Sequence, residues 1–194
     1  MELGKNIIAI LGSSLIDGTG REALKDGVVI VEGEKIKEVG QRDGVTIPQE
    51  AEVFNEAGMT IMPGLIDAHI HLTGSRRHDT IGQYDTALCV ARAIADAYNM
   101  LEHGVTATRC CGSPHTPSIK KAIEEGTSQG PRLVTSGAYI SQTCGHGDIH
   151  HLPVEWVRGI QVIADGVDEC RRAVREQLRK GADFIKVMAG GGTS

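Results

Sequence analysis

The sequence has few aromatic residues, no long apolar run and no block of basic residues. Aromatic side chains are 3% of its 194 residues, too few for an aromatic-rich binding platform. No apolar run approaches the roughly 20 residues that span a bilayer, and the first residues lack the pattern of a secretion signal. The formal net charge of −5, without a basic run, argues against nucleic acid as a partner. We therefore expect a cytoplasmic protein that binds neither membranes nor nucleic acid.

Cysteine is scarce as well, and its spacing argues against both disulfides and a cysteine-bound metal. The five cysteines are odd in number and show no paired metal-ligand spacing: Cys89, Cys110, Cys111, Cys144 and Cys170. We expect them to be reduced thiols.

Glycine is abundant, with 25 residues, and the content of 40% hydrophobic and 23% charged residues is typical of a globular protein with many turns. Residues 1–58 read as short strands joined by tight turns, and this segment is too small to hold a core comfortably on its own. An independent small β-domain is the alternative for this segment. The remaining residues, 59–194, have a different pattern.

Strands alternate with helices in residues 59–194, which predicts a parallel sheet with right-handed crossovers. Four strands, three helices and one long loop are expected, with the third helix burying Val167, Cys170, Val174 and Leu178. In chain order the segments are strand 62–72, helix 79–102, strand 105–112, helix 117–125, strand 132–137, loop 138–166, helix 167–180 and strand 184–190. Four such units make either a small open sheet or half of a closed barrel.

The first of these strands alternates two chemistries on successive residues. Its apolar side carries Ile66, Ala68, Ile70 and Leu72, and its other side carries Leu65, Asp67, His69 and His71. Imidazoles at positions i and i+2 of one strand project in parallel, so His69 and His71 can bind the same metal ion. Asp67 is placed to be a further ligand or to orient the histidines. The simpler interpretation is a strand whose histidines lie at a polar end.

Two later residues also carry candidate chemistry. Lys186 interrupts the apolar strand 184–188, and a buried lysine must lower its pKa, pair with an anion or be chemically altered. His146 lies between Gly145 and Gly147 in the long loop, where glycine permits close approach of the backbone to a ligand. A salt-bridged structural lysine and a surface histidine are the respective alternatives.

The segment Pro63-Gly-Leu-Ile-Asp-Ala-His-Ile-His71 resembles the first barrel strand of the metal-dependent amidohydrolase superfamily. The segments Gly181-Ala-Asp-Phe-Ile-Lys-Val-Met188 and Gly145-His-Gly-Asp148 are similar to its imidazolonepropionase-like and prolidase-like (Xaa-Pro dipeptidase-like) branch. This resemblance implies an α/β fold, the first half of a TIM (β/α)8 barrel in residues 59–194, preceded by part of a small β-sandwich in residues 1–58. A complete barrel needs roughly 250 residues, whereas residues 60–194 supply 135. We therefore expect the N-terminal half of a longer enzyme.

The resemblance also implies a site with two divalent metal ions. Zn²⁺ is the expected metal, and Mn²⁺ and Fe²⁺ are the alternatives. By resemblance, His69, His71 and Lys186 are metal ligands, and Lys186 is carboxylated by CO₂ to a carbamate that bridges the two ions. His146 is assigned to substrate binding or electrostatic stabilisation. The remaining ligands of the family would lie beyond Ser194, in a full-length form expected to be a homo-oligomer.

The implied activity is hydrolysis of a carbon–nitrogen bond by a metal-activated hydroxide, in a dipeptide or an N-acyl amino acid. Within the family, the alternatives are a cyclic amide or imidazolone hydrolase, a deaminase and a xenobiotic amidase. A hypothesis of another class is a non-catalytic half-barrel that serves as an interaction module.

Overall fold

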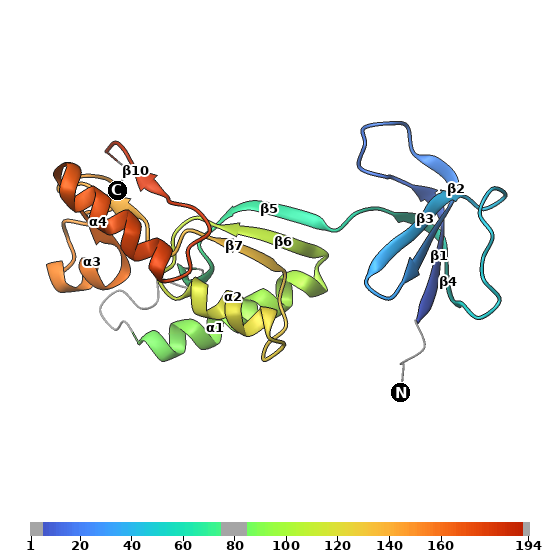
Figure 1. Cartoon of the computed structure of the whole chain (residues 1–194), viewed down its shortest axis with the longest axis horizontal. Helices are drawn as coiled ribbons and strands as arrows, with labels where there is room; N and C mark the ends of the chain where they lie inside the picture. Colours follow the sequence, from blue (N-terminus) through green and yellow to red (C-terminus); the bar gives the residue numbers. More distant parts are fainter. Residues whose placement is uncertain (1–5, 75–84, 192–194) are drawn as a thin grey trace. The chain divides into compact units, whose positions relative to one another are not determined.

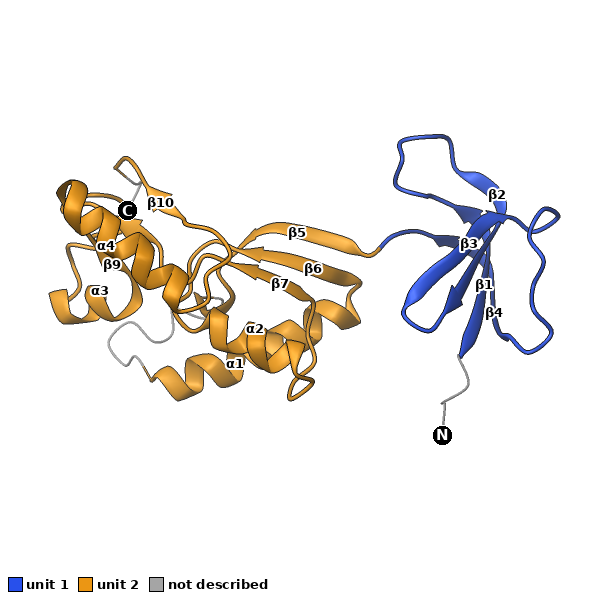
Figure 2. Ribbon diagram, in the orientation of Figure 1, with its two compact units in different colours: residues 1–63 blue, residues 64–194 orange. Residues whose placement is uncertain are grey.

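The computed structural model describes residues 6–74 and 85–191. The chain divides into two compact units, Met1–Pro63 and Gly64–Ser194 (Figure 2). Each unit has its own hydrophobic core. The core of unit 1 lies within residues 1–58, which were expected to be too small to hold one comfortably.

Unit 1 is a mixed four-stranded sheet in the order β3-β2-β1-β4. The strands are β1 (Ile7–Leu15), β2 (Leu24–Glu32), β3 (Lys35–Gln41) and β4 (Glu52–Ile61). β2 pairs antiparallel with β1 and β3, while β4 lies parallel to β1. Ala9, Leu11, Val28, Ile30 and Val45 form the core. The expected short strands are present, and the assignment of this sheet to a sandwich stays a prediction.

Unit 2 is a mixed α/β structure with two three-stranded parallel sheets (Figure 1). The first sheet has the order β5-β6-β7, from β5 (Leu65–Ile70), β6 (Val105–Cys110) and β7 (Arg132–Thr135). The second has the order β10-β8-β9, from β8 (Ile140–Ser141), β9 (Val162–Ile163) and β10 (Val187–Met188). The helices are η1 (Leu72–Gly74), α1 (Thr86–Glu102), α2 (Thr116–Glu124), α3 (Val154–Ile160) and α4 (Gly166–Arg179).

The main core of unit 2 lies between the first sheet and the helices α1 and α2. It contains Leu72, Ala93, Ala97, Cys110, Ile119 and Leu133, with Ile70 packed against it. Ala93 and Ala97 are four residues apart, so they lie on one face of α1 and let it approach the sheet closely. Asp85 caps α1 by accepting a hydrogen bond from the backbone of Leu88; the expected start of this helix at residue 79 lies outside the described residues.

Three expectations about unit 2 were wrong. Residues 138–166 are not one loop, because β8, α3 and β9 lie within them. The strand expected over 184–190 is limited to Val187–Met188, so Lys186 immediately precedes it. These elements have two to seven residues, too few for an apolar period to mark them.

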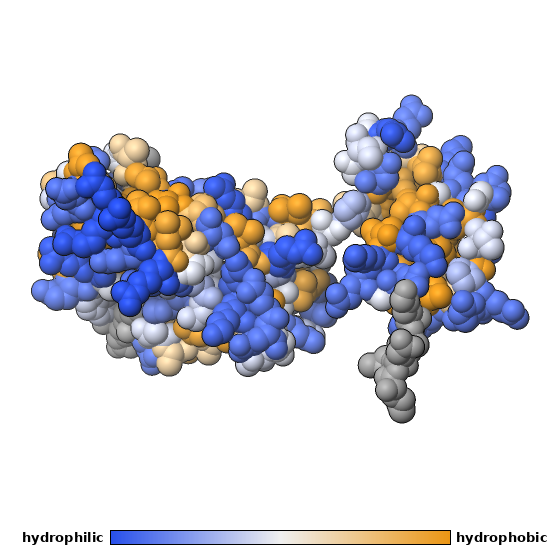
Figure 3. Space-filling model, viewed as in Figure 1, coloured by the Kyte–Doolittle hydropathy of each residue, from blue (hydrophilic) through white to orange (hydrophobic). Residues whose placement is uncertain are grey.

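The third error concerns the buried face of α4. Ala173 and Gln177 are buried there, and Val174 packs against the same core as expected. Cys170 is exposed, and Val167 and Leu178 are 72% and 51% exposed. The Gln177 side chain accepts a hydrogen bond from the backbone of Ala138, which gives this polar residue a reason to face inward. Figure 3 shows hydrophobic residues on the visible faces of both units.

Asp183 ties the segment that leads to Lys186 onto the end of β7. Its carboxylate accepts a hydrogen bond of 2.9 Å from the backbone of Thr135, which is fully buried, and contacts the Lys120 ammonium at 2.5 Å. Asp183→Ala is expected to destabilise the protein by about 1–3 kcal/mol, because a buried N–H loses its acceptor. Asp183→Asn keeps an acceptor oxygen and should lose less unfolding free energy. If chemical denaturation shows the same loss for both variants, the Asp183 carboxylate is not the acceptor that stabilises this segment.

The Asp183 carboxylate raises the pKa of Lys120 above its ordinary value of 10.5. A raised folded-state pKa stabilises the fold below the ordinary value, and that contribution is lost as the pH rises through the folded-state pKa. The difference in unfolding free energy between wild type and Asp183→Asn should therefore be constant near neutral pH and shrink above about pH 10.5. Denaturation curves across this range measure it.

Among the described residues, no helix is long and apolar enough to cross a membrane.

Candidate functional site

His69 and His71 lie at the carboxyl end of β5, as the alternation predicted. Their ring centroids are 5.5 Å apart, with the ring planes tilted by 50°. Both residues are exposed, while Ile70 between them and Leu72 after them pack into the core. Gly64, before the strand, is needed for this arrangement, because a Cβ there would lie 2.1 Å from Oγ1 of Thr106 on β6.

Asp67 interacts with its own strand in this structure. One carboxylate oxygen accepts a hydrogen bond of 3.1 Å from the backbone nitrogen of His69. Asp67 therefore supports the backbone that carries the histidines.

A backbone carbonyl fixes the ring of His71. Nδ1 of His71 lies 2.9 Å from the carbonyl oxygen of Gly112, which follows the neighbouring strand β6. A carbonyl oxygen can only accept, so Nδ1 carries the proton. In the neutral ring Nε2 then carries the lone pair, and this tautomer binds a metal ion through Nε2.

Tyr139 joins His71 to the loop that carries His146. Its ring meets the His71 ring edge-on, with centroids 6.3 Å apart and an interplanar angle of 87°. A Cβ on Gly112 would lie 2.3 Å from one side of this ring, and a Cβ on Gly147 would lie 2.8 Å from the other. Tyr139 was not predicted from the sequence, because it directly precedes the short strand β8 in a segment that was expected to be a loop.

Gly112→Ala is expected to disrupt this arrangement strongly. Gly112 has φ of 144°, and the added Cβ would overlap Tyr139 and lie 3.3 Å from Cε1 of His71. We expect a loss of about 1–3 kcal/mol in unfolding free energy from backbone strain. If His71 is a metal ligand, as predicted, the affinity for that metal should also fall about 10- to 100-fold, because the partner of His71 moves. Gly126→Ala is the matched control, since Gly126 also has positive φ but open space around it. Equal effects on metal affinity would contradict the role of Gly112.

The structure places His146 and Lys186 on neighbouring segments. The backbone nitrogen of His146 donates to the carbonyl of Gly190, 3.1 Å away, and that of Ile140 donates to the carbonyl of Lys186 at 2.9 Å. Lys186 is half-buried and the His146 side chain is exposed. Within the described ranges, no hydrogen bond links the side chain of Lys186 or His146 to the histidine pair, and no group of three His, Cys, Asp or Glu could hold a metal.

The two histidines are thus brought together, and Lys186 is positioned through its backbone alone. Their assignment as ligands of one metal centre, and the role of His146, stay predictions.

Comparison with known proteins supports the resemblance seen in the motifs. The model of the Amidohydrolase family matches residues 60–194. Ochratoxinase of Aspergillus niger is 35% identical over 210 residues, which cover 96% of this chain and 42% of that protein. Imidazolonepropionase of Paenarthrobacter aurescens is 28% identical over 169 residues, covering 84% of this chain and 36% of that protein.

Solved structures support the same relationship. The crystal structure of A. niger ochratoxinase superposes with a TM-score of 0.83 at 33% identity, over 97% of this chain and 48% of that one. The crystal structure of a prolidase complexed with N-methylphosphonate-L-proline superposes with a TM-score of 0.81 at 34% identity, over 96% of this chain and 47% of that one. The chain therefore spans about half the length of the relatives it matches.

Proposed function

The chain belongs to the amidohydrolase family, a family that is generally metal-dependent, and from this we propose that it forms the N-terminal part of a metal-dependent hydrolase of carbon–nitrogen bonds. The proposed substrate is a dipeptide or an N-acyl amino acid. The prolidase of similar fold was solved in complex with N-methylphosphonate-L-proline, which supports a substrate that ends in an amino acid.

One observation carries the proposal: the Gly112 carbonyl holds Nδ1 of His71 and leaves Nε2 free. Two imidazoles at the end of one strand suit Zn²⁺, with Mn²⁺ or Fe²⁺ as alternatives. His69 and His71 would hold the first ion. Lys186, once its amine has added CO₂ and lost a proton, would offer a carboxylate to two ions.

When bound, such ions lower the pKa of water and polarise a substrate carbonyl. The chain's own residues prepare this chemistry. Gly112 sets the His71 tautomer, and Tyr139 holds the His71 ring against the glycine loop. His146, exposed in that loop, is proposed to donate a hydrogen bond to the substrate.

The fold that best fits this proposal is half of a (β/α)8 barrel. The parallel order β5-β6-β7, with α1 between β5 and β6 and α2 between β6 and β7, supports it. On this arrangement, His69 and His71 lie at the carboxyl edge of the barrel, where such enzymes carry their active sites.

A substrate panel tests the proposal. The whole protein, loaded with Zn²⁺ or Mn²⁺, is expected to release free amino acid from dipeptides or N-acyl amino acids, and to lose this activity with a chelator. Turnover of imidazolones alone would favour the second candidate, an imidazolone hydrolase, which the 28% identity to imidazolonepropionase supports. No turnover of any amide would favour a non-catalytic interaction module.

A further inference from the structure

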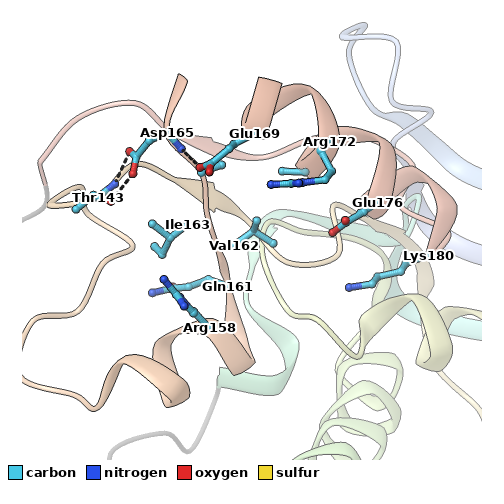
Figure 4. Close-up of a pocket in the computed structure, with 12 residues that line it drawn as sticks. Thr143, Arg158, Gln161, Val162, Ile163, Asp165, Glu169, Arg172, Glu176 and Lys180 are labelled. Atoms are coloured by element: carbon cyan, nitrogen blue, oxygen red, sulfur yellow. Dashed lines mark hydrogen bonds between the residues drawn. The ribbon is translucent and has the colours of Figure 1, made fainter. Parts of the chain in front are cut away.

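A separate pocket lies between α3, β9 and α4, and none of the four predicted site residues lines it (Figure 4). Its volume is about 480 Å³, enough for a small organic molecule. The wall of this pocket is mixed in character. Val162, Ile163, Ala164 and Ala173 are apolar, and charged residues of both signs surround them.

Gln161 is the residue that points to a ligand. It is 2% exposed and lines the pocket, yet neither Oε1 nor Nε2 has a hydrogen-bond partner among the residues described. Buried amides without partners are rare in folded proteins. Its backbone is held at the end of α3 by a hydrogen bond of 3.0 Å to Val157, so the side chain stays at the pocket. A ligand that satisfies it needs both an acceptor and a donor.

Arg158, three residues before Gln161 and on α3, also lines this pocket (Figure 4). Its exposed guanidinium makes no ion pair or hydrogen bond with any residue in the described part of the chain. A guanidinium and an amide N–H in the wall of one pocket suit a carboxylate, which accepts several charge-assisted hydrogen bonds.

Negatively charged residues also line this pocket. Asp165 accepts hydrogen bonds from the hydroxyl and the backbone nitrogen of Thr143, and these lower the pKa of Asp165. It is therefore ionised at neutral pH. Glu169, which holds the backbone of Asp165, and Glu176 add further negative charge. Arg172 and Lys180 line the same side, so its three acidic and two basic residues leave a formal net charge of −1. A ligand ammonium would be attracted to this side.

We propose that this pocket binds a free α-amino acid with an apolar side chain. Its carboxylate contacts Arg158 and Nε2 of Gln161, and its ammonium contacts Oε1 of Gln161 and faces the acidic side. The side chain packs on Val162 and Ile163. The site is distinct from the proposed metal centre, and its occupation does not require catalysis.

Titration of the intact chain with L-leucine, followed by calorimetry and by thermal unfolding, tests this site. We expect saturable binding that falls at least tenfold in Gln161→Leu and Arg158→Met. Arg175→Met is the matched control, because Arg175 is exposed on α4 outside the pocket lining. Gln161→Leu should fold with an unchanged or higher melting temperature without ligand, because it removes two unpaired buried polar atoms.

Related ligands and one further variant sharpen the test. L-Leucinamide and 4-methylpentanoate, which lack the carboxylate and the ammonium respectively, are expected to bind at least tenfold more weakly. Lys186→Met should bind L-leucine normally. Absence of saturable binding, full binding by Gln161→Leu, or equal binding of 4-methylpentanoate would each overturn the proposal.

Discussion

His71→Ala is expected to lower kcat/KM for amide hydrolysis by at least about 100-fold, or ~3 kcal/mol of transition-state stabilisation. The substitution removes the imidazole whose free Nε2 is fixed by Gly112. The amount of metal bound per chain should fall together with the activity. Elemental analysis of the purified variant and a released-amine assay measure the two effects.

His103→Ala is the matched control for that variant. His103 also places Nδ1 against a backbone carbonyl, 2.7 Å from that of Asn99, but it lies exposed at the end of α1. We expect wild-type metal content and activity. If His71→Ala keeps both, His71 is no metal ligand, whatever its tautomer.

Lys186→Met should lower activity by roughly 1000-fold, which is about 4 kcal/mol of activation free energy. The substitution removes the proposed bridging carboxylate and the negative charge that it would hold beside the two metal ions. Methionine keeps the unbranched apolar stem that packs in this half-buried position. Wild type labelled with ¹³C-bicarbonate should show a carbamate resonance that the variant lacks.

The control for this prediction is Lys121→Met, an exposed lysine in the last turn of α2. It should retain activity, metal and the carbamate resonance. A wild-type protein that binds metal fully without any carbamate signal would show that Lys186 acts as an ordinary amine, and would contradict the two-ion arrangement.

The histidine pair could be predicted from the sequence because a strand has a period of two. Ile70 and Leu72 are in the core, and His69 and His71 are exposed, as that period requires. The alternation fails over the rest of β5, because Ile66 is 72% exposed and Ala68 is exposed as well. The family followed from motifs at both ends of unit 2.

Contacts between distant residues could not be predicted. The Gly112 carbonyl reaches His71 from 41 positions away, and Tyr139 is fixed by glycines from two other segments. The buried face of α4 was misjudged for a related reason. Gln177 turns inward to hold the Ala138 backbone, and such a hydrogen bond leaves no mark in apolar periodicity.

Anomalous X-ray diffraction on crystals of the whole protein grown with Zn²⁺, recorded at the zinc absorption edge, tests the central claim most directly. We predict a peak within bonding distance of Nε2 of both His69 and His71, and of a carbamate oxygen on Lys186. A peak that touches none of these atoms, or no peak in this part of unit 2, would contradict the account.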